Sequence, residues 1–494
     1  MSEHVLVIGA GIAGLCTALA LAPSGRRVTL VERDDAPPSG DADHAFKEWN
    51  RRGVGHLRHS HAFLARLRTI IRDEHPELLA DLLAAGCREI RFEDMLTDLA
   101  KETYAPAPLD GDMVILTSRR TTLELVIRRY VERQANVEIR SGVFVRGLLT
   151  ARDDQGRMVV SGVATDEAGD IHADVVVEAG GKGATLIESL MEAGAPIREE
   201  SESAGILYFT RHYRLKPGAA EPPRGKIPAS GDLGFLKFGV FPADNGCFSI
   251  TLCAPEPEIA LRQALVRPET FDAVCRLLPG LVPWMEPDRS EPVSKVFGMG
   301  DLHSRWRDLA PEGQPAVLGF FAVGDALVRT NPLYGRGCSF AAVGGQLLRQ
   351  ALDASADPAR RLLDFQSAVL RELRPYYLSM RTQDRSAVRR AHAALTPGYR
   401  PKLKARLAKS FLEDGINIAV RADPALMREA LRGFHMLEHP DAWLKRPGNM
   451  AKVLGWWAKP RRAKAEAYPP KPGPDREALL RAIGVPPEAD MLAA

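Results

Sequence analysis

A short run of apolar, β-branched residues precedes a glycine-rich turn at the start of the chain. The run is residues 4–8, and residues 15–21, after the glycines, carry apolar side chains at helical spacing. A second apolar run, 27–31, ends on an acid, Glu32. This order predicts a strand, a tight turn, a helix and a second strand, which is the βαβ unit of an α/β fold.

The turn has the spacing of a phosphate-binding loop. Gly9 permits a sharp turn, Gly11 lets a pyrophosphate approach the backbone, and Gly14 lets the helix pack closely on the sheet. Glu32 follows about twenty residues later, where a carboxylate accepts hydrogen bonds from ribose hydroxyls. A glycine triplet alone also occurs in plain turns. The strand, the helix and the acid together predict a dinucleotide site, with Arg33 as a neighbouring contact.

The periodic pattern lapses after the second strand. Residues 34–41 are turn formers, and three histidines occur between residues 56 and 61, ahead of a helix predicted from 62 to 74. No carboxylate or thiol accompanies these histidines at the spacing of metal ligands, so we expect no metal here. We expect Arg58, in the same segment, to contact the cofactor instead.

A second nucleotide-binding signal lies far along the chain. Residues 174–178 predict a fully buried strand that runs into a glycine turn. Residues 316–323 predict another, ending in Gly324 and Asp325, and a Pro/Gly loop then leads into a helix that extends to about residue 352. An acid, a loop and a helix start of small residues suit a polar ligand held against backbone N–H groups.

Between these signals the pattern becomes β-rich. Segments between about residues 184 and 295 are separated by proline and glycine turns, which predicts an antiparallel sheet. Phe235, Phe238 and Phe241 lie there. Each one can be ordinary core, but as a group they predict the wall of an apolar, substrate-binding pocket.

The remainder of the chain, from about residue 357, is helical in pattern and rich in Arg and Lys. Trp443, Trp456 and Trp457 suit three roles: cover over a substrate entrance, contact with a membrane surface, or the packing of a helical cap on the core. We therefore expect a nucleotide-binding domain at 1–185 and 290–355, a β-rich substrate domain at 186–289 and a helical C-terminal cap at 356–494.

Composition narrows the class of protein. The 494 residues are 45% hydrophobic and 26% charged, with a net charge of +3 that argues against a nucleic-acid partner. The six cysteines are dispersed without a CxxC pair, which favours a reducing cytoplasm. The first strand begins too early for a signal peptide, and no stretch is long and apolar enough to span a membrane.

Several of these motifs together resemble FAD-dependent monooxygenases of the p-hydroxybenzoate hydroxylase fold. The resemblance covers about residues 1 to 355 and is greatest to the bacterial branch that includes flavin-dependent epoxidases of polyether and terpenoid pathways. It rests on Gly9-x-Gly11-x-x-Gly14 with Glu32, Ser118-Arg119 with Leu123-Glu124, residues 177–183, and Gly324-Asp325 with Asn331-Pro332-x-x-Gly335-x-Gly337.

The resemblance implies a Rossmann-like FAD-binding domain beside an antiparallel β substrate domain and a helical C-terminal region. It implies that Asp325 bonds the ribityl chain, that Pro332, Gly335 and Gly337 lie against the flavin, and that Arg119 approaches the cofactor. It further implies O2 as co-substrate, a flavin C4a-hydroperoxide, and epoxidation or hydroxylation of an apolar small molecule.

Residues 178–185 lack the full Asp-Gly motif of the aromatic hydroxylases. NAD(P)H is therefore expected as electron donor either directly or through a separate flavin reductase. Two alternatives stay open: an FAD-dependent reductase or dehydrogenase of isoprenoid lipids, and a non-catalytic binding protein that keeps the flavin fold as a scaffold. The resemblance identifies neither the substrate nor a catalytic acid or base.

Overall fold

A five-stranded parallel sheet forms the centre of the molecule. The computed structural model describes residues 2–166 and 168–490. The strand order is β19-β10-β1-β2-β6, and every neighbouring pair is parallel. The strands are β1 (His4–Ile8), β2 (Arg27–Glu32), β6 (Val137–Ser141), β10 (Val175–Glu178) and β19 (Phe320–Ala322). The predicted α/β class and Rossmann-like core are confirmed.

Helices with small residues pack on this sheet. Every residue of α1 (Ile12–Leu21) is buried, because the helix lies between the sheet and α11 (Gly337–Ala354). A Cβ on Gly345 would lie 3.0 Å from the carbonyl oxygen of Cys16, so the two helices need glycine to approach this closely. The same domain contains α2 (Ala42–Glu48), α3 (Ala65–Glu74), α4 (Pro76–Ala84), α7 (Arg120–Glu132), α8 (Leu186–Glu192) and α12 (Pro358–Glu372).

Three small antiparallel sheets surround the central one. Their orders are β3-β5-β4, β7-β8-β9 and β11-β18-β20. The strands are β3 (Ala62–Phe63), β4 (Arg88–Ile90), β5 (Ile115–Thr117), β7 (Val145–Arg152), β8 (Met158–Thr165), β9 (Asp170–His172), β11 (Arg198–Ser203), β18 (His303–Asp308) and β20 (Val328–Arg329). Part of the helix predicted from 62 to 74 is thus strand β3, and α3 begins at Ala65.

A second, antiparallel sheet forms the β-rich unit. Its order is β13-β14-β15-β12-β16, with β17 also paired to β12. The strands are β12 (Ile206–Leu215), β13 (Ser230–Asp232), β14 (Lys237–Pro242), β15 (Cys247–Pro255), β16 (Ser290–Pro292) and β17 (Phe297–Met299). The sheet therefore extends past residue 289. A separate apolar core joins one face of it to α9 (Ile259–Leu265), α10 (Pro268–Arg276) and α19 (Arg476–Ala482).

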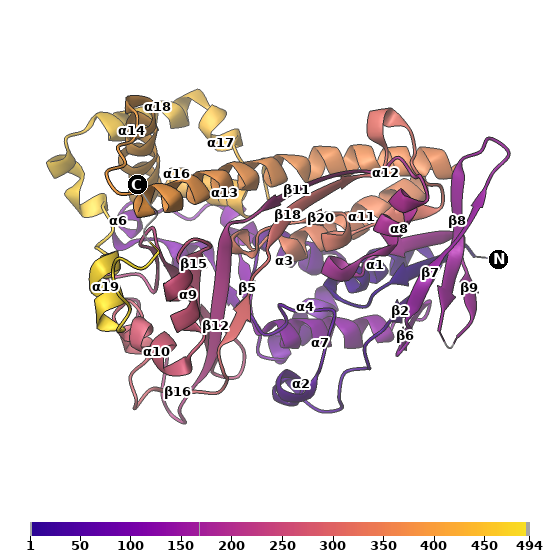
Figure 1. Ribbon diagram of the computed structural model, residues 1–494, viewed down its shortest axis with the longest axis horizontal. Coiled ribbons are helices and arrows are strands. Elements are labelled where there is room, and N and C mark those ends of the chain that lie inside the picture. The colour runs from indigo at the N-terminus through magenta and orange to yellow at the C-terminus, as the bar shows by residue number, and fades with distance from the viewer. Residues whose placement is uncertain (1, 167, 491–494) are drawn as a thin grey trace.

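One long helix, α13 (Arg374–Leu395), crosses the molecule from the parallel-sheet domain to the C-terminal helices (Figure 1). Pro375 stands in its first turn, where proline costs no hydrogen bond. Beyond it lie α14 (Leu403–Ser410), a π-helical turn (Phe411–Ile416), α15 (Asn417–Ala422), α16 (Pro424–Phe434), α17 (Ala442–Lys445) and α18 (Pro447–Ala458). Trp443 is buried with Val453 between them. Within the described residues, the helices are all too short or too polar to cross a bilayer.

The six cysteines, at positions 16, 87, 247, 253, 275 and 338, are free and buried. Burial raises the pKa of the Cys16 thiol and of the Cys87 thiol to about 12. Burial also raises the pKa of Cys338, at the start of α11. These side chains behave as small apolar residues of the core.

A buried ion pair joins the two sheet domains. Asp244, in the turn between β14 and β15, is fully buried and accepts hydrogen bonds from the backbone N–H of Arg119 at 2.7 Å and from its Nε at 3.0 Å. Thr122 donates its hydroxyl to the same carboxylate at 2.8 Å. The start of α7 is thereby fixed against the antiparallel sheet.

Removing this carboxylate should destabilise the protein strongly. Asp244→Ala leaves the buried guanidinium of Arg119 without its main partner, and loss of one member of such a pair costs about 3–5 kcal/mol. Urea unfolding should show the loss as a lower midpoint. Asp288→Ala removes an exposed aspartate from the same domain and serves as the control. Equal midpoints for the two variants would contradict the structural role of Asp244.

Candidate functional site

The glycine turn and the start of α1 form the first half of the site. Gly9 has a φ of 100°, which favours glycine, and a Cβ on Gly14 would lie 1.9 Å from the carbonyl oxygen of Gly9. A Cβ on Gly11 would meet nothing closer than 4.0 Å, where Arg51 Nη2 lies. No side chain caps the helix at Gly11, so its first N–H groups remain for an anion.

The second motif lies directly against the first. A Cβ on Gly324, which has a φ of 58°, would lie 2.5 Å from the Cβ of Ala13 in α1. No hydrogen bond within the described part of the chain ends on the carboxylate of Asp325, and burial raises its pKa. Gly335 (φ 64°) then ends a 3-10 turn that begins at Pro332 and leads the chain into α11. An unpaired carboxylate beside two helix starts suits a ligand with both hydroxyls and phosphates.

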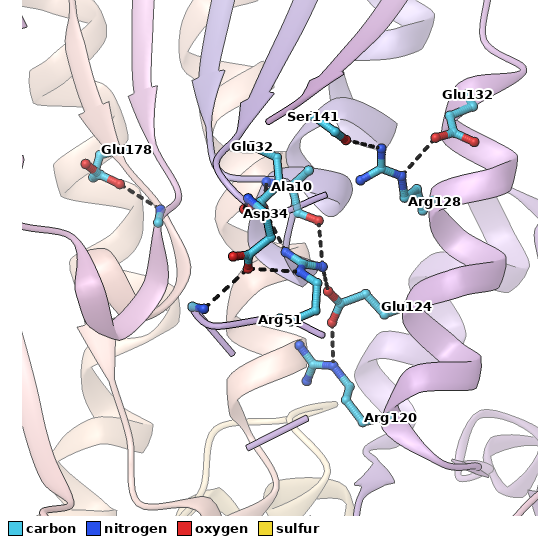
Figure 2. A network of polar contacts seen from close by, with 12 residues as sticks. Ala10, Glu32, Asp34, Arg51, Arg120, Glu124, Arg128, Glu132, Ser141 and Glu178 are labelled. Carbon is cyan, nitrogen blue, oxygen red and sulfur yellow. Dashed lines mark hydrogen bonds and ion pairs between the residues drawn. The ribbon is translucent and has the colours of Figure 1, made fainter. Parts of the chain in front are cut away.

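Arg51 lies at the mouth of the glycine turn, among three carboxylates (Figure 2). It is 6% exposed, and its Nη2 lies 2.7 Å from Glu32 while its Nη1 bonds Glu124. Its Nε is 3.6 Å from Asp34. Glu32 also accepts the backbone N–H of Ala10 at 2.8 Å. The predicted ribose acid is therefore held in place by a cation that no local sequence pattern marked.

The arginine that approaches the Gly-Asp motif is Arg120 rather than Arg119. Arg119 points to Asp244 and to Asp43, at 2.5 Å. Arg120 is buried, donates to Glu124 at 3.0 Å, and contacts Cys338 Sγ at 3.0 Å in the first turn of α11. Sequence reasoning missed Arg120, although it starts the buried helix α7.

Two other arginines were predicted to contact the cofactor, Arg58 and Arg33. Arg58 donates to the backbone carbonyls of Phe46, Lys47 and Trp49, at the end of α2. Arg33 is exposed, and its guanidinium lies 4.0 Å from the position of a Cβ on Gly183. Contact of Arg33 and Arg58 with the cofactor stays a prediction.

The three histidines of this segment, His56, His59 and His61, lie close to one another. Burial lowers the pKa of His56 to about 3, that of His59 to about 4, and that of His61 well below its usual value. His59 bonds Thr210 of β12 at 2.9 Å, and His61 bonds the carbonyl of His59 at 2.8 Å. The histidines are thus neutral and tied to the protein.

The antiparallel sheet presents a polar face to these motifs. Ser249 and Thr251 of β15 bond Ser60 at 2.6 and 2.7 Å. Phe241 pairs with Ser249 across β14 and β15, so it shares this face. Phe235 and Phe238 instead belong to the apolar core on the opposite face, beneath α9, α10 and α19.

A hydrogen-bond chain links the sheet, the Pro/Gly loop and the long helix α13. Tyr208 of β12 donates to Asn331 Oδ1 at 2.6 Å, and Asn331 donates through Nδ2 to Asp384 of α13 at 2.9 Å. Tyr334 donates to the same Asp384 oxygen at 2.9 Å. The other carboxylate oxygen of Asp384 is buried without a partner among the described residues.

A small cleft opens beside this chain of bonds. Both Asn331 and Asp384 line it. Its apolar wall comes from Ile206, Leu333 and Val388, so the cleft lies where the three parts of the molecule meet. Ligand-binding pockets occur preferentially at such junctions between domains.

Comparison with known proteins identifies the family. The sequence profile described as "FAD dependent oxidoreductase" matches residues 4–351. The chain belongs to this family. The oxidoreductase is 28% identical over 458 residues to Protein Rv3254 of Mycobacterium tuberculosis, covering 88% of this chain and 90% of that one. It is 25% identical over 372 residues to kynurenine 3-monooxygenase of Xanthomonas oryzae pv. oryzae, covering 74% and 75% of the two chains.

A solved structure with the same fold is PqsL of Pseudomonas aeruginosa, described as a probable FAD-dependent monooxygenase. The TM-score is 0.56 at 17% identity, over 79% of this chain and 98% of PqsL. The fold is that of FAD monooxygenases. The uncapped start of α1, the space in front of Gly11 and the unpaired carboxylate of Asp325 all fit FAD.

Two alanine substitutions separate cofactor binding from folding. Gly11→Ala adds a Cβ into open space, so the apoprotein should keep its stability while its affinity for FAD falls about tenfold or more. Gly14→Ala forces a Cβ against a backbone carbonyl and should cost about 3 kcal/mol or more of folding free energy. FAD titration by fluorescence and urea unfolding of the apoproteins measure the two effects. Unchanged FAD affinity in Gly11→Ala would argue that this space is not the phosphate site.

Proposed function

We propose that this oxidoreductase is a monooxygenase that transfers one oxygen atom of O2 to an apolar small molecule, by epoxidation or hydroxylation. The observation that carries the proposal is the placement of the antiparallel sheet, which is bonded through Tyr208 and Asn331 to the loop that begins at Pro332. A reaction of reduced flavin with O2 is productive only in a water-excluding pocket, and this sheet supplies a wall over the loop.

Bound FAD would supply the electron transfer and the activation of O2. The start of α1 would bind the pyrophosphate, Glu32 the ribose, and Asp325 the ribityl chain. Arg51 and Arg120 would hold Glu32 and Glu124 in place beside the bound cofactor. The neutral state of His56 and His61 keeps further positive charge out of the opening.

We assign the substrate to the cleft lined by Ile206, Leu333 and Val388, because its apolar wall adjoins the loop that would lie against the flavin. Asp384 and Asn331 also line this cleft and would provide polar contacts for a hydroxyl of the substrate. In this assignment Phe235 and Phe238 support the sheet from behind. Electrons would come from NAD(P)H, directly or through a separate reductase.

Isotope labelling tests the reaction class. The FAD-loaded protein is reduced, mixed with apolar alkenes and hydrocarbons under ¹⁸O2, and the products are analysed by mass spectrometry. We expect one labelled oxygen atom per product molecule. The matched control uses unlabelled O2 in H2¹⁸O and should leave the product unlabelled.

Two other outcomes would each overturn the proposal. Products that carry no ¹⁸O from O2, together with anaerobic electron exchange between the flavin and an unsaturated lipid, would favour the reductase or dehydrogenase of isoprenoid lipids. A colourless protein that takes up no added FAD would favour a binding protein. Running the reaction with NAD(P)H alone and with an added flavin reductase distinguishes the two routes of electron supply.

A further inference from the structure

The surface around the C-terminal end of α13 carries a high density of positive charge. The basic segment, residues 385–412, contains eight basic side chains and no acidic one. They are Arg385, Arg389, Arg390, Arg400, Lys402, Lys404, Arg406 and Lys409. Within the described residues, only Arg385, with Glu202, and Lys409, with Glu413, form ion pairs. The chain as a whole has a net charge of only +3, so this charge is concentrated locally.

The same segment exposes apolar side chains to solvent. α14 has no buried residue, and Leu403 and Leu407 are 68% and 52% exposed. They are four residues apart, so they lie on one face of the helix. Tyr399 is also exposed, just before the helix. A helix that combines exposed leucines with lysines and arginines is typical of segments that lie on a membrane surface.

The segment is attached to an ordered support. Trp457 of α18 donates its indole N–H to Ser410 at 3.1 Å, and its ring packs edge-to-face on Phe411 at 5.2 Å. α18 also exposes Leu454. Figure 1 shows α14 and α18 together at the end of α13 that is farthest from the parallel sheet.

We propose that α14 and the basic segment form a docking surface for a bilayer that carries anionic phospholipid. The cations would attract the lipid headgroups while Leu403 and Leu407 enter the boundary between headgroups and acyl chains. A second copy of this chain is a poor occupant, because the two-fold contact would bring two sets of cations together. The exposed leucines distinguish a bilayer from a soluble polyanion, which would need only the charges.

The position of this surface has a functional consequence. α13 carries Asp384, Val388 and Arg390 at the substrate cleft, and the basic segment begins on the same helix, at Arg385. A lipid-soluble substrate could therefore reach the cleft along the helix from the bilayer. The docking proposal itself does not depend on turnover, so it can fail or succeed independently of the proposed function.

Vesicle flotation with the FAD-loaded full chain tests the proposal. We expect the protein to float with vesicles of equimolar phosphatidylcholine and phosphatidylglycerol, to stay unbound with phosphatidylcholine alone, and to be released by high salt. The triple variant Lys402→Gln, Lys404→Gln, Arg406→Gln should bind on the order of 100-fold more weakly, because each cation near the surface raises the binding constant about fivefold. Leu403→Ser with Leu407→Ser should weaken binding by about tenfold or more.

Matched controls make the same chemical changes elsewhere. Arg198→Gln, Arg360→Gln and Arg371→Gln remove the same net charge from exposed sites outside the segment, and Leu370→Ser with Leu378→Ser removes two exposed leucines from α12 and α13. These variants should float like the wild type, and FAD absorbance checks that every variant is folded. Three results overturn the proposal: a wild type that does not float with anionic vesicles, equal binding to neutral vesicles, or a leucine variant that binds like the wild type.

Discussion

The buried guanidinium of Arg51 is the interaction on which the cofactor end of the molecule depends. It joins the end of β2, through Glu32 and Asp34, to α7, through Glu124, and it lies in front of Gly11. An arginine removed from water is tolerated only with compensating partners, and here three carboxylates surround it (Figure 2). The same contacts fix the carboxylate of Glu32 before any ligand arrives, so a ribose would meet an acceptor that needs little rearrangement.

Outside this network, polar contacts fix how the two sheets meet. The central sheet and the antiparallel sheet have separate apolar cores, and the C-terminal helices contribute another cluster around Trp443. The contacts between units include the Arg119 to Asp244 pair and the bonds from Ser60 to β15. Hydrogen bonds are directional, so they fix how the units are oriented, whereas apolar contact alone would allow sliding. The candidate site lies at this oriented junction.

Local patterns predicted the parts of the fold that depend on local sequence. The strand, glycine turn and helix at Gly9–Gly14, and the Gly-Asp turn at Asp325, were recognisable because each glycine there answers a backbone requirement. Arg51 could not be found in this way, because its partners come from β2 and α7 and only the folded chain brings them together. Arg120 was overlooked for a related reason. Adjacent arginines at a helix start point in different directions, and the sequence does not say which one faces the loop.

The spacing of the phenylalanines of β14 already shows that they face opposite sides of the sheet. Phe238 and Phe241 are three residues apart, and side chains at odd spacing on a strand face opposite sides of the sheet. The two could not have formed one wall, and the structure places Phe238 in the core and Phe241 on the polar face. Which face meets the cofactor domain depends on the contacts of this hairpin with Arg119 and Ser60, which are remote from β14 in sequence.

The burial of all six thiols has a consequence for an enzyme that handles oxygen. Peroxide that escapes from a flavin attacks cysteine mainly as the thiolate. With pKa values near 12 at Cys16 and Cys87, and with burial also raising the pKa of Cys338 beside the predicted flavin loop, these three side chains offer very little thiolate at neutral pH. Peroxide would therefore oxidise these three sulfur atoms mainly when the chain unfolds and exposes them.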